Sequence, residues 1–378
     1  MIVNTFMPKY MKNFKCIGSK CTDTCCAGWD INIDEDSLAK YKNSTGELKD
    51  IVEGKFISNN KEDDFFNAGY MILKDESRCP FLNEKMLCDI HGNIGEENLC
   101  ITCKNYPRVF NIIDDVYEKS ALTSCEEVCS LFLDKKSKLE FIESEEAIDE
   151  NSIEIRRIID TEAFQGTESL LQYFWEIRLA SINIMQDRKY TIEERLSILK
   201  KFYTIINDFR EDDDFNSIED LLDAFNENSF NYNDLMDSCI EVDNIFKEMI
   251  ADDKLIDNIR SKRLKRYALQ YKELLKKDIS IKEYKIIDND LNTYSYIFEN
   301  YIVNQIFKDV IPFNKGENIL DSINALINTY KLIKEYIKGN VIGENSHIYP
   351  KDIVGVIQAV SKDIEHNKVF SDIINYKF

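Results

Sequence analysis

Four cysteines near the start of the chain have types and spacing that could do chemistry. Cys16, Cys21, Cys25 and Cys26 fall within eleven positions, separated by small and polar residues that let the backbone turn. Free cysteine packs as a small hydrophobe, and packing gives no reason for adjacent pairs among turn residues. This stretch therefore predicts a site where several sulfur atoms point at one place, as in a metal or cluster centre.

Most of the remaining cysteines follow in the same third of the sequence. Ten of the eleven lie before residue 130, the later ones being Cys79, Cys88, Cys100, Cys103, Cys125 and Cys129, and Cys239 stands alone. We expect Cys239 to serve packing. The N-terminal residues have no apolar core and cleavage site of a signal peptide, so we expect a cytoplasmic protein. Thiols stay reduced there, which disfavours disulfides.

Composition limits the possible partners. The net charge is −21, and we find no stripe of Lys and Arg that rises above the acidic background, so we expect no nucleic-acid partner. No window approaches the roughly 18 apolar residues of a membrane span, so we expect no membrane partner. An acidic surface suits a basic partner such as a protein that presents lysines, although charge that merely keeps the protein dissolved is the simpler interpretation.

The chain divides by composition near residue 135. We predict an α+β protein that is mainly α, with a small cysteine-rich domain over 1–135 and a large helical domain over 136–378. In the first part we expect short helices at 34–41, 45–57 and 126–133, a strand at 70–73, and a hairpin of 109–113 with 116–122. In the second part, apolar residues recur at helical spacing over 170–181, 192–206, 217–227, 234–251, 255–277, 283–311, 317–338 and 351–374.

Two kinds of metal centre fit the cysteines. Zinc takes four Cys or His ligands, usually as paired knuckles, and two of the pairs Cys21/Cys25, Cys79/Cys88 and Cys100/Cys103 could supply them. An iron–sulfur cluster accepts scattered thiolates, often with a proline directly after one cysteine, as in Cys79-Pro80. Adjacent side chains diverge, so Cys25 and Cys26 are poor joint ligands of one zinc ion. The pattern favours a cluster slightly and leaves zinc open.

Several common enzyme signatures are absent from the sequence. A radical enzyme that cleaves S-adenosylmethionine needs three cysteines at C-x3-C-x2-C, and the third position after Cys21 and Cys25 is Gly28. No Gly-x-Gly occurs, which disfavours a dinucleotide-binding or ordinary methyltransferase turn. Phosphate-binding loops and nucleophile elbows are also missing.

The cysteine motifs resemble those of the flagellin lysine-N-methylase family. The similar segments are Cys21-x3-Cys-Cys-x-Gly-Trp, Ile-Asn-Ile-Asp34, Cys79-Pro-Phe-Leu, Leu-Cys88-x-Ile and Cys103-x2-Tyr-Pro-Arg108. Weaker likeness continues through Trp175-Glu-Ile-Arg178, Glu299-Asn-Tyr-Ile-Val-Asn304 and Ile364-Glu-His366, so it spans nearly the whole chain. One departure is Ser124-Cys-Glu-Glu127, where the family usually has Pro after the cysteine.

The resemblance implies an enzyme, a protein-lysine N-methyltransferase that methylates flagellin lysines with S-adenosylmethionine. It also implies an iron–sulfur cluster, of the four-iron type, with zinc as the alternative metal. The implied ligands are Cys21, Cys25, Cys26, Cys79, Cys88 and Cys103, with Cys16, Cys100 and Cys125 behind them. One such cluster uses at most four thiolates, so the others are structural or bind a second metal.

Other residues are candidates for the reaction itself. Tyr106 could accept the proton that the lysine loses, and Arg108 could hold a carboxylate or form a plain salt bridge. Trp29 could stack on a ligand or simply pack in a core.

Candidates for cofactor binding also lie on a helix, where Glu176 and Arg178 could face the site or form a buried ion pair. His91 is a possible ligand but is more typical of a surface residue, and His366 is a candidate through the family likeness alone.

Two functions from different classes remain open on these grounds. The first is a cluster-dependent lysine methylase. The second is a non-catalytic zinc- or iron-chelating scaffold whose helical domain binds a protein partner. Colour separates them, because a cluster protein purified without oxygen is brown and a zinc protein is colourless.

Overall fold

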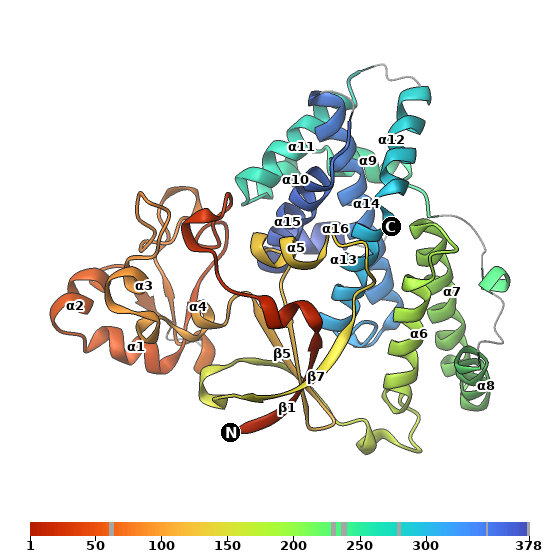
Figure 1. The fold of residues 1–378 in the computed structure, drawn as a ribbon, viewed down its shortest axis with the longest axis horizontal. Coiled ribbons are helices and arrows are strands. Elements are labelled where there is room, and N and C mark those ends of the chain that lie inside the picture. The colour runs from red at the N-terminus through yellow and green to blue at the C-terminus, as the bar shows by residue number, and fades with distance from the viewer. Residues whose placement is uncertain (60–63, 228–231, 236–239, 278–280, 345–346, 376–378) are drawn as a thin grey trace.

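The computed structural model describes residues 1–59, 64–227, 232–235, 240–277, 281–344 and 347–375. Cys239, expected to serve packing, lies outside the described residues. Within the described ranges the architecture is a small region with two sheets, followed by a large region of helices (Figure 1). The predicted fold class, α+β and mainly α, is confirmed.

A five-stranded mixed sheet forms the base of the molecule. Its order is β7 (Phe141–Ala147), β1 (Ile2–Pro8), β6 (Val116–Ala121), β5 (Arg108–Ile113) and β8 (Ile155–Ile159). β1 runs antiparallel to β7 and parallel to β6, while β5 runs antiparallel to β6 and parallel to β8. The sheet therefore takes strands from both sides of residue 135, and β1, β7 and β8 are strands that the sequence pattern did not predict.

The central hairpin of this sheet confirms its prediction and has a local cause. Asp114 and Asp115 both adopt positive φ, 49° and 61°, which suits the tight turn between β5 and β6. The Asp114 carboxylate accepts hydrogen bonds from the Thr161 backbone N–H at 2.7 Å and from Trp175 Nε1 at 2.7 Å. One turn residue thus ties the hairpin to the segment after β8 and to the first long helix.

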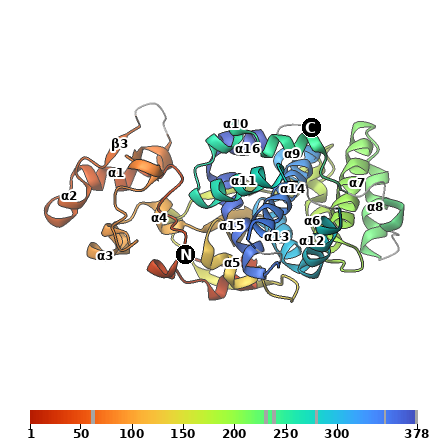
Figure 2. The same ribbon diagram turned by 90° about the horizontal axis from the view of Figure 1, so that it is seen from above.

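Most of the cysteines belong to a separate subdomain, which we call the thiol subdomain and define as residues 15–105. It holds a second, three-stranded sheet in the order β2 (Asn32–Ile33), β4 (Gly69–Met71), β3 (Phe56–Ser58). Its helices are short: α1 (Glu35–Lys42), α2 (Gly46–Val52), α3 (Asp89–Ile94) and α4 (Ile101–Asn105). Both views show it standing beside the helical region (Figures 1 and 2).

Helices make up most of the rest. They are α5 (Glu126–Phe132), α6 (Phe174–Gln186), α7 (Ile192–Glu211), α8 (Phe215–Asn226), α9 (Asn244–Ile250), α10 (Asp253–Asn258), α11 (Lys262–Leu274), α12 (Ile281–Thr293), α13 (Ser295–Lys308), α14 (Ile319–Glu344), α15 (Pro350–His366) and α16 (Lys368–Ile374), with a short strand β9 (Asn314–Glu317).

Three long helical stretches that we predicted are each divided in two. The stretch 255–277 breaks before Ser261, whose side chain accepts a hydrogen bond from the Leu264 N–H and starts α11. The stretch 351–374 breaks at Asn367, which caps α16 in the same way. Such caps offer the backbone a partner that ends one helix and begins the next, and apolar periodicity does not reveal them. The stretch 283–311 breaks at Tyr294, where no side-chain cap is formed.

Two hydrophobic cores hold most of these parts, and a third, small cluster of Val3, Phe110, Tyr117, Ile148 and Ile153 packs at the five-stranded sheet. The helices share one core with the five-stranded sheet, since Met7, Ile113 and Ala121 pack with helical residues such as Ile302. The thiol subdomain has a core of its own, which includes Ile33, Phe81 and the two buried thiols Cys79 and Cys100. The separate cores do not test the division that we predict at residue 135, because the helical core takes residues from both sides of it, so that division stays a prediction. None of the described helices is long and apolar enough to span a bilayer.

Candidate functional site

A cavity of about 680 Å³ lies where the thiol subdomain meets the sheet and the last helices. Trp29 and Thr102 come from the thiol subdomain, Arg108 begins β5, and Glu365 and His366 end α15. The other lining residues are Asp30, Asn32, Phe66, Asn67, Asn105, Tyr106, Val109, Leu122, Glu154, Arg156, Ile364, Lys368 and Ser371. Three residues that we predicted from the sequence, Trp29, Tyr106 and Arg108, are therefore brought together in one cavity.

Three rings form an aromatic wall in this cavity. Trp29 stacks on His366 with 4.5 Å between ring centroids and lies 5.7 Å from Tyr106. The Tyr106 and His366 rings are 6.0 Å apart. Trp29 Nε1 donates a hydrogen bond of 2.6 Å to the Cys25 carbonyl. The wall is thus attached directly to the first cysteine motif.

Ser124 connects the aromatic wall to a carboxylate. Its Oγ accepts a hydrogen bond of 3.2 Å from the Tyr106 hydroxyl and lies 3.1 Å from His366 Nε2. The Ser124 backbone N–H donates to Glu365 Oε2 at 3.2 Å, and its carbonyl accepts from Gln358 Nε2 at 2.8 Å. Ser124 is buried and directly precedes Cys125. A single buried residue therefore links the cavity, α15 and a thiol.

The ionisable rings of the wall are held neutral. Burial, together with the positive charges of Arg156, Lys362 and Lys308, lowers the pKa of His366 to about 3. Burial and the neighbouring thiols of Cys125 and Cys25 raise the pKa of Tyr106 well above its usual value. Near neutral pH the wall presents an uncharged imidazole and an un-ionised phenol, both of which suit contact with a cation.

Charged groups face the cavity as well. The Glu365 carboxylate is 5% exposed and lies 3.5 Å from the Lys308 ammonium. Arg108 lies over the Phe14 ring at 5.1 Å and donates to the Lys104 carbonyl at 3.4 Å. Within the described ranges Arg108 makes no ion pair. Its guanidinium is therefore available to an anionic group, as the sequence suggested.

Three of the thiols accept backbone hydrogen bonds. Cys88, Cys100 and Cys125 each stand directly before a short helix, and backbone N–H groups two or three residues later point at their sulfurs. Such bonds lower the thiol pKa and stabilise thiolate. For Cys88 and Cys125 burial outweighs this effect and raises the pKa. The local folding of these motifs thus provides what a ligating sulfur requires.

The thiols influence one another in two groups. In the first, burial raises the pKa of Cys79 to about 12, and Cys88, Cys100 and Cys25 add to the rise. The sulfurs of Cys100 and Cys103 contact each other, and Cys26 lies near this pair. The second group contains Cys16, Cys21, Cys25 and Cys125. Cys25 takes part in both groups, and its sulfur lies 4.0 Å from that of Cys26.

The thiols are not arranged as a closed metal site. Among the residues that the structure describes, no three His, Cys, Asp or Glu side chains converge closely enough to hold one metal ion. The donors suit a soft metal in kind, since they are thiols, several with backbone N–H groups on sulfur. The six predicted ligands and the three behind them divide between the two groups, so the structure does not reduce them to one set of four.

Other residues that the sequence suggested for the site lie outside the cavity. Arg178 forms a two-bond ion pair with Glu118, at 2.6 and 2.9 Å, with both side chains buried. Glu176 is exposed on the opposite face of α6. Neither lines the cavity. Cys129 is buried, and its thiol donates to the Thr123 carbonyl at 3.0 Å, as in ordinary packing.

Sequence reasoning missed two residues of the site, Ser124 and Glu365. Both lie inside segments that carry the family likeness, Ser124-Cys-Glu-Glu127 and Ile364-Glu-His366. The likeness marked the segments without indicating that they contact each other. Only the packing of α15 against α5 and against Thr123 and Ser124 before it brings together residues about 240 positions apart.

Comparisons with known proteins agree with the family likeness. Residues 178–378 match the family model described as the FliB lysine N-methylase C-terminal domain. The chain is 26% identical over 213 residues to a "Lysine-N-methylase" of Salmonella typhimurium, which covers 55% of this chain and 48% of the relative. It is 31% identical over 132 residues to the "Flagellar biosynthetic protein FliU" of Salmonella muenchen, covering 33% of this chain and 75% of that protein.

These matches have a defined extent. The aligned part spans about half the length of the lysine methylases. No solved structure matches. The family model nevertheless covers more than half of this chain, from Arg178 through the last helices, and includes the cavity residues Glu365 and His366. The chain belongs to the FliB lysine N-methylase family.

Proposed function

We propose that this protein methylates lysine side chains of flagellin at the cavity between the thiol subdomain and α15. The observation that carries the proposal is the aromatic wall of Trp29, Tyr106 and neutral His366 beside the buried Glu365 carboxylate. Rings and a carboxylate attract an alkylammonium ion through cation–π and ion-pair contacts. The names of the relatives, a lysine methylase and a flagellar protein, support this substrate.

The residues around the cavity would have different roles in the reaction. The wall and Glu365 would bind the incoming lysine as its ammonium. Once the proton has passed to Glu365, the exclusion of water favours the neutral amine that must attack. The Tyr106 hydroxyl donates a hydrogen bond to Ser124 and has a raised pKa, so it suits orientation better than proton acceptance. The Glu365 carboxylate is the group that we assign to hold the departing proton. The amine nitrogen of the lysine would then form a bond to the methyl carbon of the methyl donor. The bond between that carbon and the donor's sulfur would break, and the sulfur would keep the electron pair.

S-adenosylmethionine is the methyl donor in this proposal and supplies a methyl group on a positively charged sulfur. Its amino-acid end carries a carboxylate, and Arg108 makes no ion pair within the described residues, so Arg108 would bind that carboxylate. Trp29 would contact the sulfonium or the adenine ring. We do not assign Glu176 or Arg178 to this role, because they do not line the cavity.

The thiols would hold an iron–sulfur cluster, with zinc as the alternative. The first group, Cys26, Cys79, Cys88, Cys100 and Cys103, lies in the thiol subdomain and contains two buried sulfurs. When bound, a cluster would fix the cysteine motifs to which Trp29 is attached. Iron and sulfide analysis of protein purified without oxygen tests this, and a zinc-only protein would contradict it.

The methylation itself is tested by transfer of label. The protein, purified without oxygen, is incubated with flagellin and methyl-labelled S-adenosylmethionine, and labelled lysines are sought by mass spectrometry. We expect Glu365→Gln to lower kcat about 100-fold, a typical loss for one proton-transfer group. Trp29→Leu should weaken substrate binding.

The matched control is Glu176→Gln, which removes an exposed carboxylate outside the cavity and should leave the rate unchanged. If the parent protein labels no flagellin lysine and calorimetry shows no binding of S-adenosylmethionine, the methylase proposal is wrong. The non-catalytic metal scaffold that binds a protein partner would then be the better explanation.

A further inference from the structure

Helix α11 and the three residues after it carry an unusual concentration of positive charge. In a chain with net charge −21, the segment 262–277 has seven Lys or Arg residues and one acidic residue, Glu273. This segment is an exception to our expectation that no stripe of Lys and Arg rises above the acidic background. On the folded protein, the basic residues of α11 lie along one exposed helix, so the local charge differs from the global one.

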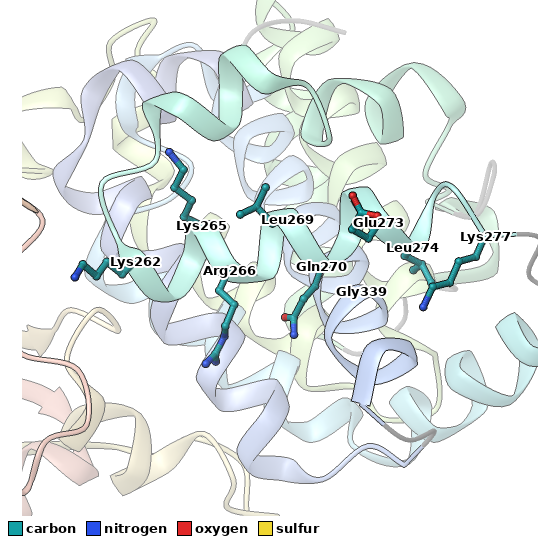
Figure 3. A pocket seen from close by; sticks show the side chains of 9 residues that line it. All are labelled: Lys262, Lys265, Arg266, Leu269, Gln270, Glu273, Leu274, Lys277 and Gly339. Atoms are coloured by element: carbon teal, nitrogen blue, oxygen red, sulfur yellow. The ribbon is translucent and has the colours of Figure 1, made fainter.

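A groove of about 500 Å³ follows this helix. Its lining is Lys262, Lys265, Arg266, Leu269, Gln270, Glu273, Leu274 and Lys277 with Gly339 of α14. Figure 3 shows these side chains distributed along α11, with the basic ones at both ends. Leu269 is 46% exposed between them. The groove therefore combines an apolar middle with a basic rim, a pattern that fits a segment of opposite charge.

Some basic residues along the groove are paired with carboxylates of this chain, and others are not. Lys265 and Lys272 pair with Asp257 and Asp253. Among the residues that the structure describes, Arg266 and Lys277 form no salt bridge, and Glu273, which pairs with Lys276, lies near Lys277. The Arg266 guanidinium lies 5.1 Å from the Tyr267 ring and is exposed. These two cations therefore remain available to carboxylates of another molecule.

One end of the groove lies close to the proposed methylation cavity. Arg260, two residues before α11, pairs at 2.7 Å with Asp30, which lines that cavity. Lys262, which lines the groove, pairs at 2.5 Å with Glu76 of the thiol subdomain. A chain held along α11 would therefore reach the thiol subdomain at the side where the cavity lies.

We propose that the α11 groove docks an acidic amphipathic segment of the protein substrate, separate from the lysine to be methylated. This inference rests on the proposed function and adds how the substrate is chosen. Carboxylates of the segment pair with Arg266 and Lys277, and its apolar side covers Leu269. A lysine-rich surface is repelled by the same rim, so the acidic segment and the target lysine are directed to different sites.

The test reverses the charge of the two available cations. In Arg266→Glu/Lys277→Glu we expect the KM for folded flagellin to rise about tenfold with kcat unchanged, since rim charges act on association. The rate with a short lysine peptide that lacks acidic residues should not change. The control is Lys138→Glu/Lys189→Glu, the same change of charge at exposed positions beside α6, which should keep the parent KM.

A binding experiment separates this inference from the methylase proposal. A fluorescein-labelled helical peptide of Glu, Leu and Ala should bind the parent protein, release with added salt, and bind the double variant at least about tenfold more weakly. This result is independent of methyl transfer, so it stands even if no lysine is labelled. An unchanged peptide affinity in the double variant would overturn the inference. So would preferential binding of a DNA oligonucleotide at the same site.

Discussion

His366 has surroundings that oppose its protonation. It stacks on Trp29, contacts Ser124 through Nε2, and is surrounded by Arg156, Lys362 and Lys308, which oppose a positive charge. Glu365 is the acidic neighbour, and it is already held by Lys308 and the Ser124 N–H. Because the folded pKa of about 3 is below the unfolded value, the folded protein keeps His366 neutral when the unfolded chain would protonate it.

This difference between the folded and unfolded pKa of His366 predicts a contribution to stability that is lost in acid. The contribution is complete above the unfolded His pKa of about 6.5 and is lost as pH falls toward about 3. His366→Gln removes the titration, so its urea midpoint should fall less than that of the parent between pH 7 and about pH 4. The measurement is urea unfolding at several pH values. Parallel curves for parent and variant would contradict a neutral buried imidazole.

Arg178 illustrates a different role for a charged residue. It was a candidate for cofactor binding, yet it packs over the Phe307 ring at 4.4 Å and pairs with Glu118 in the sheet. Burial raises the pKa of Glu118, and Arg178 opposes that rise. The pair thus joins α6 to β6 and depends on both partners.

Removing one partner of this pair should be costly. Arg178→Met leaves Glu118 buried without its cation and should destabilise the protein by about 3–5 kcal/mol at neutral pH. The double variant Glu118→Gln/Arg178→Met should recover most of the loss, because no uncompensated charge remains. Thermal or denaturant unfolding measures both. Equal stability of the single variant and the parent would show that the pair is not a structural one.

At the level of elements, α11 and α14 approach each other unusually closely. A Cβ added at Gly339 would lie 2.6 Å from the Tyr271 Cα and 2.7 Å from its backbone nitrogen. Backbone atoms cannot move aside as a flexible side chain can. The glycine therefore sets the spacing of the two helices, and with it the floor of the groove beside α11.

Gly339→Ala should force α11 and α14 apart. We expect a loss of about 1–3 kcal/mol in unfolding free energy, the usual cost of overpacking. A useful control is Gly92→Ala, also within a helix, where an added Cβ meets nothing within 4 Å. That change should be neutral or slightly stabilising, since alanine favours helix. If both variants unfold alike, the close approach of the helices does not limit stability.

On the scale of the whole molecule, the helical core and the core of the thiol subdomain differ in the interactions that can stabilise them. The helical core is large and continuous, whereas the thiol subdomain relies on a smaller core that includes Cys79, Cys100 and their neighbours. A small core contributes little free energy of folding, and metal binding often adds the stabilisation that such a domain needs. The thiol subdomain should therefore be the part that depends on metal.

Loss of metal should unfold one part before the other. Cys79→Ser, or prolonged chelation, should make the thiol subdomain sensitive to protease while residues after α5 stay resistant. Cys25→Ser should act similarly, and Cys239→Ser should behave like the parent. Limited proteolysis with mass spectrometry identifies the cut sites. Unchanged protease resistance after complete metal removal would show that the subdomain folds without metal.

The sequence by itself determined what depends on local pattern. Cysteine spacing marked the thiol motifs, and the two aspartates marked the hairpin turn that β5 and β6 share. Apolar periodicity located the helical region, because a helix must bury one face whatever lies opposite. The likeness to a lysine methylase family came from the same local motifs, and Tyr106, Arg108 and Trp29 came with them.

Tertiary structure alone decided which of these motifs meet. α15 lies more than 200 residues from β6 and α5, and only their packing places His366 against Ser124 and Trp29. It also separated Arg178 from the cavity and added β7 and β8 to the sheet, since strand pairing is a long-range choice. A local pattern fixes which face of an element is apolar, but the partner that covers it is chosen by the whole chain.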